Sequence, residues 1–548
     1  MKPKTSILYL IIIVTLTSCF DKMKKADLIV HNAKVYTVDS NFTIQQAFAV
    51  QDGKFLSVGT DSAILSNFQS ENIIDAKGKV IYPGFNDGHS HFTGYAKNIY
   101  GYANLVGTKS FEEVIEVLKN HHKNNEGEWL IGRGWDQNDW EVKEFPDKKE
   151  LDRLFPGNPV VLIRVGGHTV LANSEALKRA GINRETKIEG GFIEKKNDGL
   201  TGILLENASD AMRNTIPELN NVQKTKALIR AQENCFSVGL TSVTDAGLDK
   251  HEVKLIDSLQ KAEELKIRIY AMLIPTEENF EEFVRKGKYK TGKLCVCSIK
   301  LFSDGALGSR GAKLIEPYSD DNENSGLLRE TPEHYRNMCE IAYKKDYQVN
   351  THAIGDSAVR LMLNIYGRFL KSKNDKRWRI EHSQVVNPDD FYLFEKYSII
   401  PSVQTTHATS DMYWAEDRLG QERITGAYAY KKLLNQNGWL INGTDFPIED
   451  INPIYTFYSA VVRKDLNGYP EHGFQMENAL SREETLKSMT IWPAKGSFEE
   501  NEKGSIEPGK FADFVVLDKD IMQIESSEIP YIKVLSTYLG GEKVYSRE

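Results

Sequence analysis

The sequence lacks several features that would narrow its class. Its five cysteines among 548 residues are too few for a disulfide framework. Acidic residues outnumber basic ones by 77 to 69, for a formal net charge of -8, and there is no basic stripe, so the composition gives no case for nucleic-acid binding. No repeat or low-complexity linker stands out. A content of 40% hydrophobic and 10% aromatic residues is typical of a folded globular protein, and the length exceeds one ordinary domain.

The N-terminus carries a short apolar run that precedes the folded part of the chain. Lys2 and Lys4 are followed by apolar residues 6–16, a stretch too short to span a bilayer comfortably and typical of a signal peptide. It ends in Leu16-Thr-Ser-Cys19, which resembles a bacterial lipobox. We therefore expect residues 1–19 to be a lipoprotein signal peptide, with lipidation of Cys19. The alternative is an ordinary signal peptide with an incidental cysteine.

Lipidation at Cys19 predicts a protein of the bacterial cell envelope that faces the periplasm or the exterior. Stable anchoring requires more than one acyl chain, and the lipid anchor is then the only expected contact with a membrane. The sequence does not distinguish the inner from the outer membrane.

The rest of the chain alternates between two kinds of pattern. Short β-type segments at residues 27–80 and 503–548 predict a small composite β-sandwich built from both chain ends. Between them, residues 81–502 alternate short apolar strands with helical patterns, which predicts an α/β fold, a (β/α)₈ TIM barrel. Residues 95–235 exceed one βα unit, so we expect most of them to form an insertion over the barrel mouth. The eight expected barrel strands are 80–84, 240–245, 267–274, 297–302, 348–352, 378–382, 399–403 and 439–445.

The first expected strand is followed by His89-Ser-His91. Residues two apart on an extended segment point to the same face, so both imidazoles can reach one metal ion. Taken alone this pattern is weak, because a surface loop can carry two histidines by chance.

Other metal-ligating residue types follow later strands. His352, His382 and Asp445 each stand at the last position of an expected strand, and Lys300 lies near the end of the fourth. Strand parity places Lys300, Ser298 and Val296 inside the barrel, and Cys295, Cys297 and Ile299 against the helices. All the strand-end groups would converge on one mouth of a TIM barrel, which predicts a site for two metal ions. An unmodified lysine is a poor ligand, so we expect a CO₂-derived carbamate on Lys300; the alternative is a Schiff-base nucleophile.

The order of these residues and the motifs around them resemble the amidohydrolase superfamily, and within it the YtcJ-like branch (amidohydrolase family 3), which includes N-substituted formamide deformylases. The resemblance covers the chain from about residue 27 to its end. It implies a (β/α)₈ barrel with a composite β-sandwich, zinc as the usual metal, and hydrolysis of C–N bonds in small molecules. The motifs that carry it are His89-Ser-His91, residues 300–310, 352–356, 379–382, 443–447 and 504–513.

The resemblance also implies a mechanism. Two divalent ions roughly 3.5–4 Å apart can share a bridging hydroxide, which attacks the substrate carbonyl. Asp445 would take the hydroxide's proton and deliver it to the leaving amine. We assign His89, His91 and Asp445 to one ion and His352 and His382 to the other, with carboxylated Lys300 between them.

Four further residues are candidates for substrate contact. His168, in a Gly-Gly-His motif similar to one in the family, is expected to contact the substrate or the developing oxyanion; it is otherwise an ordinary loop histidine. Asp304 and Arg310 follow the fourth strand and either line the mouth or pair with one another. Trp135 either forms part of a lid with Asp136 or packs in a buried core.

Several alternatives stay open at this stage. The same site would serve a lactone or ester hydrolase. A mononuclear deaminase would not need Lys300, and a catalytically silent barrel would act as an envelope binding protein. The choice of metal, the substrate and the oligomeric state, for which a homodimer is a family-level expectation, are not readable from the residues.

Overall fold

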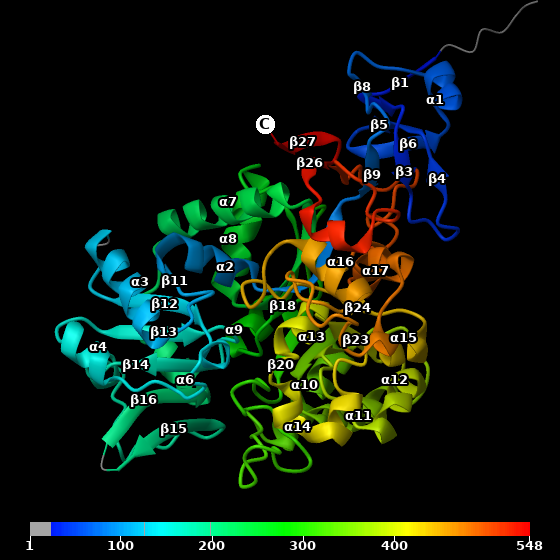
Figure 1. Cartoon of the computed structure of the whole chain (residues 1–548). Helices are drawn as coiled ribbons and strands as arrows, with labels where there is room; N and C mark the ends of the chain where they lie inside the picture. The colour runs from blue at the N-terminus through cyan, green and yellow to red at the C-terminus, as the bar shows by residue number, and fades with distance from the viewer. Residues whose placement is uncertain (1–22, 125–126, 198, 548) are drawn as a thin grey trace, which may run out of the picture.

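A computed structural model describes residues 23–124, 127–197 and 199–547. Its centre is a nearly closed barrel of eight parallel strands, which confirms the predicted fold (Figure 1). In barrel order the strands are β10 (Phe85–Ser90), β17 (Leu240–Leu248), β18 (Arg268–Leu273), β20 (Leu294–Phe302), β21 (Gln348–Ala353), β22 (Arg379–His382), β23 (Ile400–Val403) and β24 (Ile441–Asn442). Cysteine 19 and the expected signal peptide lie outside the described residues.

Helices follow most of the barrel strands, as the alternating pattern predicts. Their apolar faces pack with the outward side chains of the strands into the largest hydrophobic core. The main ones are α2 (Phe92–Gly101), α7 (Asn221–Ser237), α8 (Lys250–Lys261), α10 (Pro332–Lys344), α11 (Asp356–Leu370), α12 (Phe391–Tyr397), α13 (Thr405–Asp411), α14 (Ala415–Arg423), α15 (Tyr430–Asn437), α16 (Pro453–Val462), α17 (Arg482–Ser488) and α18 (Ile491–Gly496).

The position of the first barrel strand differs from the prediction. The apolar run Val80–Pro83 is β9, which pairs with the terminal strands β25 (Phe514–Leu517) and β3 (Lys34–Tyr36). The first barrel strand is instead the more polar β10, so His89 lies within the strand and not after it. The prediction failed here because β10 is buried on both faces while carrying polar site residues, which hides its strand pattern.

Strands from the two chain ends share one sheet, in the order β27 (Glu542–Ser546), β26 (Val534–Leu539), β25, β9, β3 and β4 (Ile44–Gln45). A second sheet of β6 (Lys54–Gly59), β5 (Ala47–Gln51), β2 (Leu28–His31) and β8 (Ile73–Asp75) packs against it. Phe48, Phe55 and Phe514 meet between the sheets, with rings of Phe48 and Phe514 5.0 Å apart. Figure 1 shows these blue and red segments side by side.

The part of the chain after α2 and before α7, within the predicted insertion, forms a six-stranded sheet. This sheet stands beside the barrel (Figure 1). Helices α3 (Phe111–Asn124) and α4 (Lys149–Leu154) pack on one face, and α5 (Ser174–Arg179) and α6 (Asn207–Arg213) on the other. Its strands are β11 (Ala103–Asn104), β12 (Leu130–Trp135), β13 (Val160–Arg164), β14 (Thr169–Ala172), β16 (Gly199–Glu206) and β15 (Gly191–Lys196).

The parity prediction for β20 is right for Lys300 and Ile299 and wrong for its first half. Cys295 and Cys297 lie with Tyr270 and Met272 in a separate buried cluster, whereas Val296 joins the outer core. The cause is a register shift between β18 and β20 just after Val296, which puts an extra residue into the strand.

The barrel closes where β10 meets β24, a boundary that we call the seam. Among the described residues, these two strands are not paired by a hydrogen-bonded ladder. Asp87, buried in β10, accepts hydrogen bonds from the backbone N–H of Thr444 at 3.1 Å and from its hydroxyl at 2.7 Å. The backbone N–H of Asp445 donates to the carbonyl of His89 at 2.8 Å. A glycine is required at 443, because a Cβ there would lie 2.4 Å from the nitrogen of His89.

Within the described part of the chain, no helix combines the length and apolar character needed to cross a membrane.

We predict that Gly443→Ala destabilises the protein by about 1–3 kcal/mol, because the added methyl group must push β10 and the 443–445 segment apart. Chemical unfolding would measure the loss. Gly157→Ala is the matched control, since a Cβ at that position meets no atom within 4 Å and it should leave the unfolding midpoint in place. Equal midpoints for the two variants would show that the seam tolerates separation.

Candidate metal centre

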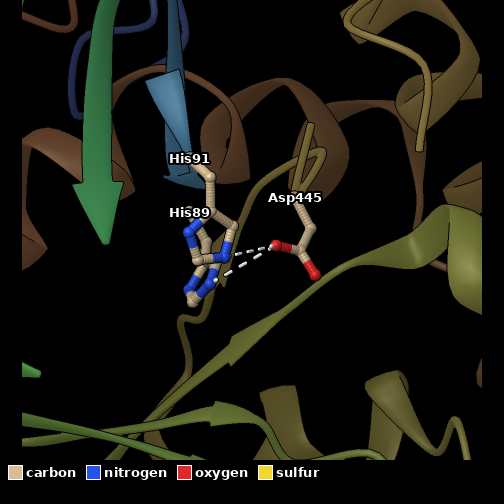
Figure 2. A group of neighbouring side chains, drawn as sticks. All are labelled: His89, His91 and Asp445. Atoms are coloured by element: carbon tan, nitrogen blue, oxygen red, sulfur yellow. Dashed lines mark ion pairs between the residues drawn. The ribbon is translucent and has the colours of Figure 1, made fainter. Parts of the chain in front are cut away.

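Two histidines and an aspartate meet at the carboxyl end of β10. His89 Nε2 and His91 Nε2 lie 3.6 Å and 3.3 Å from Asp445 Oδ1, as Figure 2 shows. The other ring nitrogen of His89, Nδ1, is 2.5 Å from Glu381 Oε2 on β22, which fixes the orientation of the imidazole. A carboxylate behind a ligating histidine is the usual arrangement in metal sites.

A second group forms on the other oxygen of Asp445. His407 Nε2 lies 3.7 Å and His382 Nδ1 3.9 Å from Asp445 Oδ2. In each of the two groups all ligand atoms lie within 4.8 Å of one another, close enough to hold a metal ion. Sequence reasoning missed His407, because it stands inside α13 and not at the end of β23. The polar run Gln404-Thr-Thr-His407 directly after the seventh strand was the available signal.

Lys300 and His352 lie beside these groups. The Nζ of Lys300 is 3.3 Å from His89 Nε2, inside the barrel as predicted. Burial lowers the pKa of Lys300 to about 8, although the charges of Glu381 and Asp445 oppose this effect. The His352 ring centroid lies 4.5 Å from that of His382. The structure thus brings together all six predicted metal-site residues, with His352 and Lys300 outside the two tightest groups.

The electrostatics of the centre suit metal ligands. Burial lowers the pKa of His91 to about 4 and holds the pKa values of His352 and His382 well below the usual range, so their imidazoles are neutral. Burial alone would raise the pKa of Asp445, but contact with His91 and the proximity of His89 and His382 hold this pKa well below its ordinary value. Neutral imidazole and ionised carboxylate are the forms that bind divalent ions.

Unsatisfied atoms and strained backbone provide a test of whether an ion fits. Among the described residues, Asp445 Oδ1 and His407 Nε2 are buried without a hydrogen-bond partner. His382 and Asp445 have φ values of +73° and +60°, in a region that non-glycine residues rarely adopt. Unpaired buried polar atoms and such strain are costly unless a ligand or the site's function compensates. The nitrogen and oxygen donors therefore fit divalent ions such as zinc.

His168 approaches the centre from the inserted sheet. Its ring centroid lies 4.8 Å from that of His352, and its Nδ1 is 2.7 Å from Oε2 of Glu206. Sequence reasoning missed Glu206, which is 1% exposed at the end of β16. A Cβ on Gly305 or Gly311 would lie 1.9 Å or 2.3 Å from Glu206 Oε1, so these glycines make room for the carboxylate.

The structure places Asp304 and Arg310 in the support of the loop after β20. Asp304 accepts hydrogen bonds from the backbone N–H groups of Lys313, Ile354 and Gly355, at 2.8–3.0 Å. Arg310 pairs with Asp320 at 2.9 Å. Asp304 and Arg310 thus have different partners. Their contacts stabilise the loop after β20 and do not indicate a contact with substrate.

Trp135 is 1% exposed and donates from its indole nitrogen to the carbonyl of Leu162 at 3.0 Å. Its ring packs near Trp140 and Phe145, with centroids 5.9 Å and 6.3 Å away. The structure therefore agrees with the second interpretation from the sequence, in which Trp135 packs in a buried core. The neighbouring Asp136 forms an ion pair with Arg164.

Comparison with known proteins places these features in one family. A family model described as Amidohydrolase family matches residues 72–545. Protein LONG AFTER FAR-RED 3 of Arabidopsis thaliana is 32% identical over 540 residues, covering 95% of this chain and 92% of that protein. YtcJ of Bacillus subtilis is 29% identical over 527 residues (94% and 99%), and an N-substituted formamide deformylase of Arthrobacter pascens is 25% identical over 543 residues (95% and 98%). The resemblance drawn from the motifs is confirmed.

A solved structure extends the comparison to three dimensions. An uncharacterized metal-dependent hydrolase from Pyrococcus horikoshii superposes with a TM-score of 0.74 at 28% identity, covering 91% of this chain and 99% of that chain. The likeness includes both the barrel and most of the remaining chain.

We predict that His407→Ala lowers the affinity for divalent metal by about tenfold or more, since the second group loses a ligand. Metal per chain, measured after dialysis against a weak chelator, would report the loss. The exposed His472→Ala is the control and should retain the wild-type metal content. Full retention by His407→Ala would remove this residue from the ligand set.

Proposed function

The chain belongs to the amidohydrolase family, and we propose that it is a hydrolase that cleaves a C–N bond of an amide, formamide or related small molecule. Members of the family are metal-dependent hydrolases, and candidate His/Asp metal groups are present here. The named activity of the Arthrobacter pascens relative supports the choice of a formamide or similar amide.

The observation that carries the proposal is the position of Asp445 between two sets of histidines. Its two carboxylate oxygens each face a different group, His89 and His91 on one side and His382 and His407 on the other. We assign one divalent ion, for which zinc is the first choice, to His89, His91 and Oδ1 of Asp445. A second ion is assigned to His352 and His382, with His407 beside them, which leaves Oδ2 of Asp445 to handle a proton. We propose that Lys300, which is buried 3.3 Å from His89 Nε2, would carry a CO₂-derived carbamate and serve as a further ligand.

Bound ions would supply an activated water and polarise the substrate carbonyl. The residues of the chain then handle the proton. Asp445 is ionised and can accept a proton from the attacking water, and the same carboxyl can pass it to the nitrogen of the leaving amine. The atoms balance as one water added across the C–N bond, giving a carboxylic acid and an amine.

His168 is the candidate for a direct contact with the substrate from the inserted sheet. Glu206 holds Nδ1 of its ring, which leaves Nε2 for the carbonyl oxygen or the leaving group. Because Glu206 is buried and acts only through His168, we assign it a positioning role.

We also propose that the protein is held at the bacterial cell envelope by lipidation of Cys19. The support is the sequence alone: two lysines, an apolar run and the Leu16-Thr-Ser-Cys19 ending. Labelling with a fatty-acid analogue should mark the wild-type protein and not the Cys19→Ala variant, and equal labelling would exclude this modification site.

We predict about two metal ions per chain in the wild type purified with bicarbonate present, and a clear loss in Lys300→Ala, because the bridging group disappears. Elemental analysis and hydrolysis of a panel of N-formyl and N-acetyl amines would be measured together. Lys178→Ala, exposed on α5, is the control.

The outcomes separate the alternatives. One ion that is unaffected by Lys300→Ala would indicate a mononuclear enzyme such as a deaminase. Turnover of esters or lactones only would favour the ester hydrolase. Two ions without turnover of any substrate would contradict the proposed activity and leave a binding protein.

We predict that Glu206→Gln lowers kcat by about tenfold to a hundredfold while the metal content stays at the wild-type value, as expected for a residue that orients another. Glu206→Asp should recover part of the loss, because it restores the charge. Glu150→Gln, on the exposed side of α4, should change neither quantity. A loss of metal in Glu206→Gln would show that the residue supports the metal centre instead.

A further inference from the structure

Arg133 stands in a motif of the inserted sheet that the proposed chemistry does not use. It lies on β12 between Gly132 and Gly134, and the pairing with β13 shifts register between Arg133 and Trp135. Gly134, with φ +109°, takes up this bulge, and a Cβ there would lie 2.4 Å from the side chain of Val106. Bulges often stand next to active sites, where they change the direction of a side chain.

The guanidinium of Arg133 lies between the two segments that deliver His91 and His168. Asn98 lies on α2, the helix that begins directly after His91. With the side-chain amide of Asn98 oriented so that its nitrogen and its oxygen both have partners, the oxygen accepts a hydrogen bond from Arg133 Nε at 3.0 Å. Nη2 donates to the carbonyl of Val165 at 3.2 Å. Nη1 lies 3.5 Å from the position of a Cβ on Gly167, the residue before His168.

Arg133 differs from the other arginines of this region in having no counter-ion. Among the described residues no carboxylate lies within 4.0 Å of it, whereas Arg164 pairs with Asp136, Arg329 with Asp210 and Arg418 with Asp320. The contacts with Asn98 and Val165 use two of its five N–H groups, so donors of Nη1 and Nη2 stay available.

Arg133 is close enough to the metal centre for the charge of Asp445 to influence its pKa. Burial and the nearby Arg213 lower the pKa of Arg133 to about 10, while Asp445 raises it. The carboxylates elsewhere around the mouth are already bound: Glu449 accepts from Ser410 at 2.6 Å, and Asp411 accepts from Gln384 and Tyr428, each at 2.8 Å. A half-buried cation without a counter-ion is costly, and a bound anion would remove that cost.

We propose that Arg133 binds a carboxylate of the substrate, close to the scissile C–N bond, so that the preferred substrates are acylated amino acids or related amido acids and not neutral amides. The planar guanidinium matches a carboxylate through two parallel hydrogen bonds. This inference rests on the proposed hydrolysis of C–N bonds and names its substrate class.

The test compares N-formyl amino acids with the matched N-formyl amino acid amides, which differ only in the charged group. The wild type should show a higher kcat/KM for the acids, and Arg133→Gln should reduce the acid-to-amide ratio by about tenfold to a hundredfold. Arg133→Lys should recover only part of the preference, because lysine offers a single point charge. Arg153→Gln, exposed on α4, should leave the ratio unchanged.

A binding measurement separates this inference from the proposed function. Calorimetric titration with N-formylglycine should give a weaker Kd for Arg133→Gln than for the wild type, whether or not turnover occurs. Turnover of amides with equal kcat/KM for acids and amides would overturn the substrate class alone. Absence of turnover together with an Arg133-dependent Kd would overturn the C–N hydrolysis and retain the carboxylate site. An unchanged Kd and an unchanged ratio would reject Arg133 as the recognition residue.

Discussion

The metal centre depends on how the first and last barrel strands meet. His89 lies on β10, His91 directly follows this strand, and Asp445 lies in the segment after β24. The relative positions of the three residues therefore depend on this seam. Asp87 supplies the closure, since its buried carboxylate accepts from the backbone of both His89 and Thr444. Gly88 and Gly443 allow the backbones to approach, and a Cβ on Gly88 would lie 2.1 Å from Ile441. A carboxylate, two glycines and the hydrogen bonds between the two segments thus replace a strand ladder at this point.

Charge buried inside the barrel sets the form of each ligand. Glu381 stands behind His89, and Lys300 lies in front of it, so the imidazole is held between an anion and an amine. The same carboxylate lies 4.0 Å from Arg379, whose Nη1 donates to the carbonyl of Gly88 at the seam. The arrangement that orients the ligand is therefore continuous with the one that closes the barrel. Because each buried charge has an opposite charge or a hydrogen-bond partner nearby, loss of one member would leave another uncompensated.

The sequence was informative where function follows a strand end and uninformative where it does not. His352, His382 and Asp445 were found because βα units bring strand ends to one mouth. His407 was missed because it lies inside a helix, and Glu206 because its partner, His168, is 38 residues away in the chain and the contact is visible only in the fold. The first strand was misplaced because the apolar run at Val80–Pro83 belongs to the terminal sheet, while β10 carries polar residues inward. The bulge after Val296 reversed the predicted side of two cysteines, since one extra residue shifts the period-two pattern.

The barrel and the inserted sheet divide the work of the site. The barrel contributes the six predicted metal-site residues, which lie on strands or in the segments that follow them, and His407, which lies in α13 after β23. The inserted sheet contributes His168 and Arg133, which approach the centre from outside the barrel strands. Changes in the inserted sheet can therefore alter what the site recognises without moving the ligands, because the loop that carries His168 joins the barrel through Glu206 and the glycines at 305 and 311. In this chain the inserted sheet is therefore the part in which a substitution would change substrate recognition while the metal chemistry of the barrel stays the same.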